Sequence, residues 1–323
     1  MGAIAFEIAA VSLCESFTPL VKTTPAILDR QKTRTPTLAS TSPEDIASEP
    51  VSLAVPLNFL GNIGYPSIEL QFDHSTLNFI LATGSNLDTV HPAVAQQLQL
   101  PVVTEFTDVG VVSTGLGGSF RGGQLLRLGD ATIAGETCFL DVQAASFDVH
   151  TGEGLLGTPF FLAFGEGVEF RWHDDVPALV LHQQGSADLR GMTRVPLGLL
   201  SASIMTLPLT LGEMTMDSLL VTCSPITIVS PEAAQRLGLQ VSDDFVSGID
   251  GSPLYKSASS VAASVGGVVL GEPRQIFIGT VPAVQFLQTL GPAPEIVLGL
   301  DFLRQSRRML IKLGSREIFF QGF

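Results

Sequence analysis

Two stretches of the chain decide its fold: residues 82–92, ATGSNLDTVHP, and residues 221–231, VTCSPITIVSP. They align with a shift of 139 residues, and the eight residues after each stretch match as well. Two further anchors recur in the same order with nearly the same shift: VPL (55–57) returns as VPL (195–197), and GLLGTPFF (154–161) returns as IVLGLDFL (296–303). Ordered anchors at one offset are typical of an internal repeat. The sequence predicts two similar lobes, residues 51–190 and 191–323, behind a leader of residues 1–50.

Composition points to strands and turns. Of the 323 residues, 32 are glycine and 20 are proline, 45% are hydrophobic and only 15% are charged. This is typical of many short strands, and it predicts a mostly β protein. The formal net charge of −14 argues against a nucleic-acid binder, while the apolar content argues against a disordered acidic chain. A basic partner or none is expected.

Local patterns fit this class. Residues 67–72 alternate apolar and polar side chains as a half-buried strand does, and the mostly apolar run 77–81 suits a central strand. Pro92 and Pro231 stand where a first helical turn accepts proline, which predicts a short helix after each. Proline and glycine interrupt the uncharged run 195–212, so we expect two buried strands there rather than an integral membrane segment.

The cysteines and the N-terminal residues bear on the compartment. Cys14, Cys138 and Cys223 show no metal or redox spacing, and their odd number favours an intracellular, reducing compartment. Residues 1–14 lack the basic start of a secretory signal. Residues 22–50 are rich in Thr, Ser and Pro, with scattered Lys and Arg, which is typical of a disordered leader or linker. A targeting segment for an organelle such as the plastid remains an alternative.

The repeated unit resembles the lobe of aspartic proteases of the retropepsin and pepsin superfamily. The resemblance rests on TGS (83–85) after an apolar strand, Val-x-Pro before a short helix, and LLGTPF (155–160), and it covers nearly the whole chain from about residue 51. It implies two homologous closed β-lobes with short helices and a cleft between them. In that family an Asp-Thr/Ser-Gly loop from each lobe supplies one aspartate, and the pair shares a proton and activates a water.

Neither aspartate is present here. Ala82 precedes a fitting Thr83-Gly84, so one Asp→Ala change, natural or introduced, would explain the first loop. Val221 precedes Thr222-Cys223, where the glycine has changed as well. Since methyl and isopropyl groups cannot exchange protons, no catalytic residue is expected at these six positions. The resemblance therefore implies a catalytically inactive aspartic-protease-like protein that binds peptides or acts as a scaffold or assembly component.

The alternative is an aspartic endopeptidase whose first aspartate is replaced by Ala82, so whether the chain is an enzyme stays open at this point. Under either reading, the expected partner is a peptide or protein. The resemblance places binding residues in the two loops, at Ser85 and Ser224. It also places them in the flap, a hairpin that closes over the substrate in this family, at Gly117 and Gly118. The corresponding hairpin of the second lobe supplies Asp250 and Gly251.

Other candidate chemistry is weaker. Asp88 and Asp217 are expected in turn or cap roles, and Asp301 in a structural hydrogen bond. The five histidines lack ligand spacing, so neither a metal nor a cofactor is expected. Cys223 is expected to be a small buried thiol. The glycine-rich stretch 115–123 fails the dinucleotide and phosphate-loop patterns and predicts a flexible hairpin.

Overall fold

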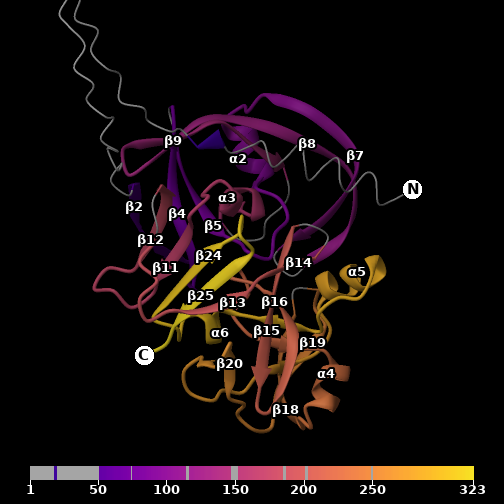
Figure 1. Cartoon of the computed structure of the whole chain (residues 1–323). Coiled ribbons are helices and arrows are strands. Elements are labelled where there is room, and N and C mark those ends of the chain that lie inside the picture. Colours follow the sequence, from indigo (N-terminus) through magenta and orange to yellow (C-terminus); the bar gives the residue numbers. More distant parts are fainter. Residues whose placement is uncertain are drawn as a thin grey trace, which may run out of the picture.

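The computed structural model describes residues 18–19, 51–73, 75–113, 116–146, 152–184, 187–200, 203–248 and 250–323. A shared sheet takes strands from both halves of the chain in the order β13-β25-β24-β11-β12-β2 (Figure 1). Its strands are β2 (Val51–Pro56), β11 (Gly167–Arg171), β12 (Ala178–Gln184), β13 (Thr193–Pro196), β24 (Arg308–Lys312) and β25 (Glu317–Gln321). The order is unchanged when β2 is exchanged for β13, β11 for β24 and β12 for β25. The two halves therefore meet in this sheet around an approximate two-fold axis.

The edges of the shared sheet end in proline, at Pro56 and Pro196. An edge strand tolerates proline because no ladder hydrogen bond is needed on its outer side. The next residue pairs alike in both halves: the Leu57 amide donates to the Pro177 carbonyl at 2.9 Å and the Leu197 amide to the Arg316 carbonyl at 3.0 Å. The expectation of two strands over residues 195–212 is wrong. The run contributes to β13, β14 (Gly198–Leu200) and β15 (Ile204–Leu211), because the chain leaves the shared sheet at Pro196.

Each half of the chain adds a sheet of its own; we call the N-terminal half lobe 1 and the C-terminal half lobe 2. In lobe 1 the order is β1-β9-β6-β10-β5-β4-β8-β7 with β3 beside β4; in lobe 2 it is β18-β19-β22-β17-β23-β16-β15-β20-β21 with β14 beside β15. The lobe 1 strands are β1 (Thr18–Pro19), β3 (Asn58–Leu60), β4 (Tyr65–Phe72), β5 (Ser75–Leu81), β6 (Thr89–Val90), β7 (Val102–Ser113), β8 (Leu116–Ile133), β9 (Glu136–Ser146) and β10 (Gly154–Leu156). The remaining lobe 2 strands are β16 (Met214–Leu220), β17 (Ile228–Val229), β18 (Val241–Ser247), β19 (Pro253–Ser257), β20 (Ala263–Val265), β21 (Val268–Val269), β22 (Phe277–Ile278) and β23 (Ile296–Leu298).

The centre of each lobe sheet is built in the same way. Strand β10 runs parallel to β5 and antiparallel to β6, and β23 runs parallel to β16 and antiparallel to β17. The mostly β, two-lobed pepsin-like fold expected from the sequence is thus the observed one. Strand β1 was not expected: Thr18 and Pro19 pair with Leu140 and Phe139 of β9. The rest of the leader, residues 1–50, lies outside the described residues.

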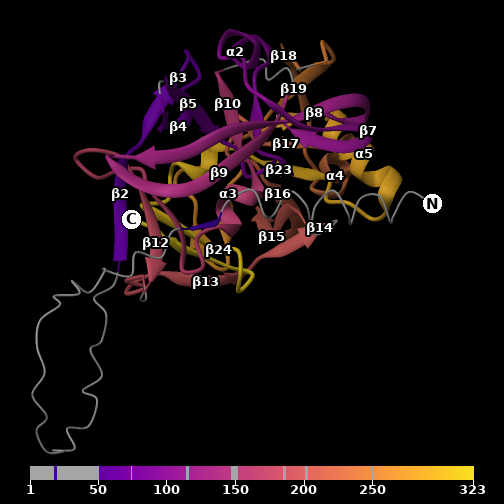
Figure 2. The ribbon, with the colours of Figure 1, turned by 90° about the horizontal axis from the view of Figure 1, so that it is seen from above.

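Short helices follow the central strands. Helices α2 (Pro92–Gln97) and α4 (Pro231–Arg236) begin at the predicted prolines, and the Ser230 hydroxyl caps α4 by accepting from the Ala233 amide at 3.0 Å. Helices α3 (Thr158–Leu162) and α6 (Leu300–Leu303) come directly after β10 and β23. Helix α5 (Pro282–Leu290) of lobe 2 lies beside β8 of lobe 1, which arches across the molecule (Figure 2). Among the described residues, no helix combines the length and apolarity that a membrane crossing requires.

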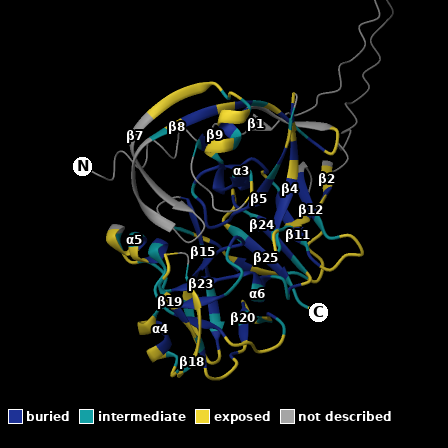
Figure 3. Cartoon of the chain, turned by 180° about the vertical axis from the view of Figure 1, so that it is seen from behind, coloured by how far each residue is buried: buried dark blue, intermediate teal, exposed yellow. Residues whose placement is uncertain are grey.

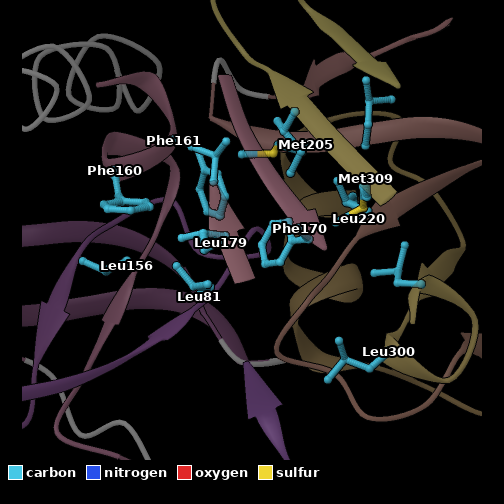
Figure 4. Close-up of a cluster of buried hydrophobic side chains, with 14 of the residues drawn as sticks. Leu81, Leu156, Phe160, Phe161, Phe170, Leu179, Met205, Leu220, Leu300 and Met309 are labelled. Carbon is cyan, nitrogen blue, oxygen red and sulfur yellow. The ribbon is translucent and has the colours of Figure 1, made fainter. Parts of the chain in front are cut away.

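The hydrophobic core is continuous between the lobes. Phe160, Phe161 and Phe170 pack near Leu81 at the end of β5, and the same buried cluster contains Leu220 at the end of β16 (Figure 4). Residues of the outer hairpins and of the surface helices are among the exposed ones (Figure 3). Burying one such leucine or phenylalanine contributes about 1.5–3 kcal/mol, so the ends of β5 and β16 are firmly held. These ends are where the two loops of interest begin.

Candidate functional site

The loops 82–85 and 221–224 have the same backbone arrangement. The Ala82 amide donates to the Leu156 carbonyl at 2.9 Å, and the Val221 amide donates to the Leu298 carbonyl at 3.1 Å. Each loop then closes on itself, since the amides of Ser85 and Ser224 donate back to the carbonyls of Ala82 and Val221. The paired strands fix the start of each loop, and the turn fixes its end. Both loops are therefore presented in one geometry.

Two threonines join the loops across the two-fold axis. The Thr83 hydroxyl donates to the Leu220 carbonyl at 2.8 Å and accepts from the Thr222 amide at 3.0 Å. In return, the Thr222 hydroxyl donates to the Leu81 carbonyl and accepts from the Thr83 amide at 3.1 Å. Both side chains are fully buried. We call the junction of the two loops the seam; each threonine there satisfies a buried donor and acceptor of the other lobe.

The side chains that flank this threonine pair are apolar. Ala82 is 0% and Val221 is 6% exposed, and both belong to one buried cluster with Cys223. Neither carries a proton that can be exchanged, so the seam cannot provide the acid and base that hydrolysis by a carboxylate pair needs.

Packing in the seam differs between the lobes. A Cβ atom added to Gly84 would lie 2.9 Å from a methyl carbon of Val221. Under the two-fold correspondence, Gly84 matches Cys223 and Val221 matches Ala82. Val221, which is larger than its counterpart Ala82, therefore faces a glycine at position 84. By the same correspondence, Cys223 occupies the position that faces Ala82. Cys223 is a buried thiol, as the sequence indicated.

The two serines of the loops form hydrogen bonds within their own turns. The Ser85 hydroxyl donates to the Leu87 carbonyl at 2.8 Å, and the Ser224 hydroxyl donates to the Ile226 carbonyl at 2.7 Å. Ser85 is fully buried, whereas Ser224 borders the cavity described below. A role for them in binding a ligand stays a prediction.

Two carboxyl groups, those of Asp88 and Asp301, form hydrogen bonds next to the loops. Asp88 Oδ1 accepts from the Gly157 amide at 2.6 Å, and Oδ2 has no hydrogen-bond partner among the described residues. Burial raises the Asp88 pKa well above its ordinary value, against the backbone amides of Gly157 and Phe160. Asp88 has the cap role expected of it, because its carboxyl accepts from the amide of Gly157, the N-cap residue of α3, although that helix is distant in sequence. The turn or cap role expected of Asp217 is wrong: Asp217 lies within β16, opposite Pro208.

In lobe 2 the equivalent backbone amide, that of Gly299, has a different residue as its acceptor. The Thr227 hydroxyl accepts from the Gly299 amide at 3.0 Å, which matches the bond from Gly157 to Asp88. That hydroxyl donates to Asp301 Oδ1 at 2.7 Å, and the Thr227 amide donates to Oδ2 at 2.9 Å. The structural hydrogen bond expected of Asp301 is confirmed. Burial raises the Asp301 pKa, while the bonds from Thr227 and Phe302 and the charge of Arg274 oppose the rise.

A cavity of about 340 Å³, which we call the seam cavity, opens beside the loops on the lobe 2 side. Lobe 1 contributes Ile63, Tyr65 and Gly84 to its wall. Most of the lobe 2 wall is apolar: Ile204, Leu219, Val221, Cys223, Pro225, Ile226, Ile228, Leu254, Val281, Pro282, Ala283 and Val297. Burial, followed by the nearby Cys223, raises the pKa of the Tyr65 phenol, which therefore stays neutral. A wider depression of about 610 Å³, lined by Arg236 and Glu295 among others, lies away from the seam.

The predicted hairpin residues are placed differently from one another. Asp250 borders the seam cavity, and its Oδ1 accepts from the amide and hydroxyl of Ser252, which lowers its pKa. Gly251 forms the adjoining turn with φ of 82°. Gly117 and Gly118 lie in β8, opposite Val112 and Val111 of β7, so the predicted hairpin is present.

Sequence reasoning missed two features of this site. The hydrogen bonding between Thr83 and Thr222 joins residues 139 apart, and its only signal was that both repeats carry threonine at this position. The cavity wall draws on segments near residues 63, 204, 226 and 282, which no local pattern connects.

Comparison with known proteins gives two findings. No protein-family model matches the sequence, and no curated relative matches it either. Similar solved structures include basic 7S globulin from soybean, with TM-score 0.49 and 10% identity over 84% of this chain and 96% of that chain. They also include conglutin gamma, a basic 7S globulin from lupine seeds, with TM-score 0.47 and 11% identity over 85% of this chain and 96% of that chain.

Proposed function

We propose that this chain is a protein of pepsin-like fold whose seam has no proteolytic activity and which binds a peptide or protein segment through the seam cavity. We call the reciprocal hydrogen bonds of Thr83 and Thr222 the threonine frame. The observation that carries the proposal is that this frame is intact while the residues at 82 and 221 are apolar. The frame holds the loops where a carboxylate pair would act, but the side chains there can only pack. Binding is the activity that such a site retains.

The wall of the seam cavity indicates what it would bind. Its volume of about 340 Å³ is at the lower end of the usual 300–1,000 Å³ for ligand pockets. An apolar side chain of a peptide fits this lining better than a charged one. At the rim stands Asp250, a carboxylate kept ionised by Ser252, and the chain has a formal net charge of −14. We therefore propose an apolar residue with Lys or Arg beside it as the preferred segment.

The proposal is tested by peptide binding and a variant that fills the cavity. Ala283 borders the seam cavity on α5, whereas Gln285 of the same helix is exposed and outside it. Ala283→Leu is expected to weaken binding of fluorescent peptides containing Phe or Leu beside Lys by at least tenfold, measured by fluorescence anisotropy. Gln285→Leu adds an apolar group to the same helix and should leave the affinity unchanged.

The outcome against the proposal is equally definite. If no peptide of a hydrophobic and basic library binds below about 1 mM, the affinity of a weak contact, then the cavity is not a binding site. Equal loss of affinity in Ala283→Leu and Gln285→Leu would place binding elsewhere on the surface.

A further inference from the structure

A serine, a histidine and a glutamate are linked on one face of the shared sheet. Ser52 on β2 lies directly opposite His182 on β12, and Glu169 lies on the next strand, β11. The Ser52 Oγ atom is 2.9 Å from His182 Nδ1, and His182 Nε2 is 3.0 Å from Glu169 Oε2. Gly167, opposite His182 on β11, carries no side chain beside the ring. Cross-strand pairing thus brings together residues that are distant in sequence.

Burial increases along this chain of contacts. Ser52 is exposed on an edge strand, His182 is 5% exposed and Glu169 is 0% exposed. A hydroxyl that reagents can reach therefore touches an imidazole that is held from behind. This is the layout in which a base and an orienting acid serve a nucleophile.

The charges around Glu169 determine the direction of the hydrogen bonds. Its carboxylate pairs with Arg308 of β24 and with Arg171 of β11, whose Nε lies 3.0 Å from Oε1. Burial alone would raise the Glu169 pKa, but hydrogen bonds from His182, Arg308 and Arg171 lower it to about 2. A carboxylate can only accept, so Nε2 of His182 carries the hydrogen that it donates to Glu169. In the neutral ring Nδ1 is then an acceptor, and the Ser52 hydroxyl donates to it.

Guanidinium groups surround the Glu169 carboxylate. Two guanidinium groups, Arg171 and Arg308, face one carboxylate, and Arg308 also donates to the backbone carbonyl of Asp188 at 2.9 Å. The nearby Asp188 carboxylate is paired with Arg190 at 2.8 Å. The ion pairs of Arg171 and Arg308 fix the Glu169 carboxylate that binds the His182 ring.

We propose that Ser52, His182 and Glu169 form a second site, a nucleophilic site that reacts with small carboxylic esters. Ser52 Oγ bonds to the carbonyl carbon as its proton passes to His182 Nδ1. The bond from that carbon to the alcohol oxygen then breaks, and the alcohol leaves with this proton. A water molecule attacks the acyl-serine by the same route, giving up one proton to His182, which returns it to Ser52 as the acid departs. Glu169 holds the ring and is a positioning residue.

The test uses the whole chain with p-nitrophenyl acetate and with a fluorophosphonate probe, followed by peptide mass spectrometry. An acetyl or phosphonyl group is expected on Ser52. Ser52→Ala should abolish that labelling, and His182→Gln should slow it at least tenfold, since a general base contributes 10²-fold or more. Ser315→Ala is the matched control, because the Ser315 hydroxyl donates directly to Glu317 at 2.8 Å without an imidazole. Labelling of Ser315 as fast as Ser52 would overturn the proposal.

Two further readouts complete the test, one on the unaltered chain and one on a thiol placed at position 52. In the unaltered chain, Ser52 should be labelled faster than Ser315, whose hydroxyl is paired with Glu317 rather than with an imidazole. No label on Ser52 at all would overturn the proposal. In Ser52→Cys, iodoacetamide should alkylate the new thiol at least tenfold faster than in Ser52→Cys/His182→Gln; equal rates would contradict a role for His182.

Discussion

The loops at 82–85 and 221–224 share a backbone and differ in their side chains. Both begin at the end of a central strand, make the same two backbone hydrogen bonds and place a threonine in the opposite lobe. At the flanking positions, however, lobe 1 has Ala82 and Gly84 and lobe 2 has Val221 and Cys223. The comparison teaches that the hydrogen-bond frame and the chemistry are separable. The frame stabilises the junction of the lobes, whereas the side chains at 82 and 221 decide whether protons can move.

A second comparison, one layer behind the loops, leads to the same view. The amides of Gly157 and Gly299 each need an acceptor, and they find a carboxyl group at 88 in lobe 1 but a hydroxyl at 227 in lobe 2. Lobe 2 keeps its acid at 301 instead, with donors on both oxygens. The lobes thus satisfy one backbone requirement by different chemistry, with different consequences for pH.

The largest expected effect is on catalysis. The unaltered chain should not cleave peptides between about pH 3 and 8, because each missing acid or base accounts for 10²-fold or more. Ala82→Asp alone should stay inactive: one buried carboxyl beside Val221 would have a raised pKa and no partner to hold the complementary proton. Of the variants considered, only Ala82→Asp/Val221→Asp/Cys223→Gly restores two carboxylates and the turn glycine, so any latent acid protease activity should appear in that variant alone.

Fluorogenic peptides, with and without a transition-state mimic of aspartic proteases, measure this activity. Ala82→Asp/Val221→Asp with Cys223 retained is the matched control for the glycine. Strong acid proteolysis by Ala82→Asp alone would identify the chain as an enzyme inactivated at one position and would exclude the binding proposal.

The next effect concerns the threonine frame. Thr83→Val and Thr222→Val each remove a hydroxyl that serves a buried carbonyl and a buried amide of the other lobe. Leaving buried groups unpaired costs about 1–3 kcal/mol each, so each variant should lose roughly 3 kcal/mol of unfolding free energy in urea. The two losses should be similar, because the bonds are reciprocal. Thr83→Ser keeps the hydroxyl and should lose much less; a strong inequality between the lobes would show that the frame is not shared.

Much of the fold was predictable because local patterns recur at one offset. Pro92, Pro231 and Ser230 identified the starts of two helices, and the repeated strand and turn identified the loops. The links between distant residues were not predictable. Asp88 reads as a turn residue in its local sequence, and only the packing of β10 against β5 reveals its bond to Gly157. Ser52 and His182 become neighbours only through the pairing of β2 with β12.

A smaller effect is expected from packing in the seam. Gly84→Ala would place a methyl group 2.9 Å from Val221, closer than contact distance. Overpacking of this kind costs about 1–3 kcal/mol. Adding Val221→Ala should recover most of the loss, which a double-mutant cycle from urea unfolding measures. Additive losses, without recovery, would mean that the two residues are not coupled across the axis.

The smallest expected effect is a difference between Asp88 and Asp301 in how the unfolding free energy depends on pH. Because burial raises the pKa of Asp88 in the folded chain, the folded state holds its proton to higher pH than the unfolded state does. The stability that the protonated group provides is therefore full below the unfolded pKa of about 4 and falls as pH rises toward the folded value. Asp88→Asn retains an acceptor for the Gly157 amide and cannot ionise. Relative to the unaltered chain, it should gain unfolding free energy at pH 7 and little at pH 4.

Asp301→Asn should behave in the opposite way. Its two oxygens accept from the hydroxyl and amide of Thr227 and from the Phe302 amide, and an amide side chain would set an N–H against one of these donors. A loss of unfolding free energy is expected at pH 7, in contrast to the gain in Asp88→Asn. Asp217→Asn, exposed in β16, is the control and should change little at either pH. Urea unfolding at pH 4, 5.5 and 7 measures all three, and a loss in Asp88→Asn that grows toward pH 7 would contradict the assignment of a buried, proton-holding acid to lobe 1.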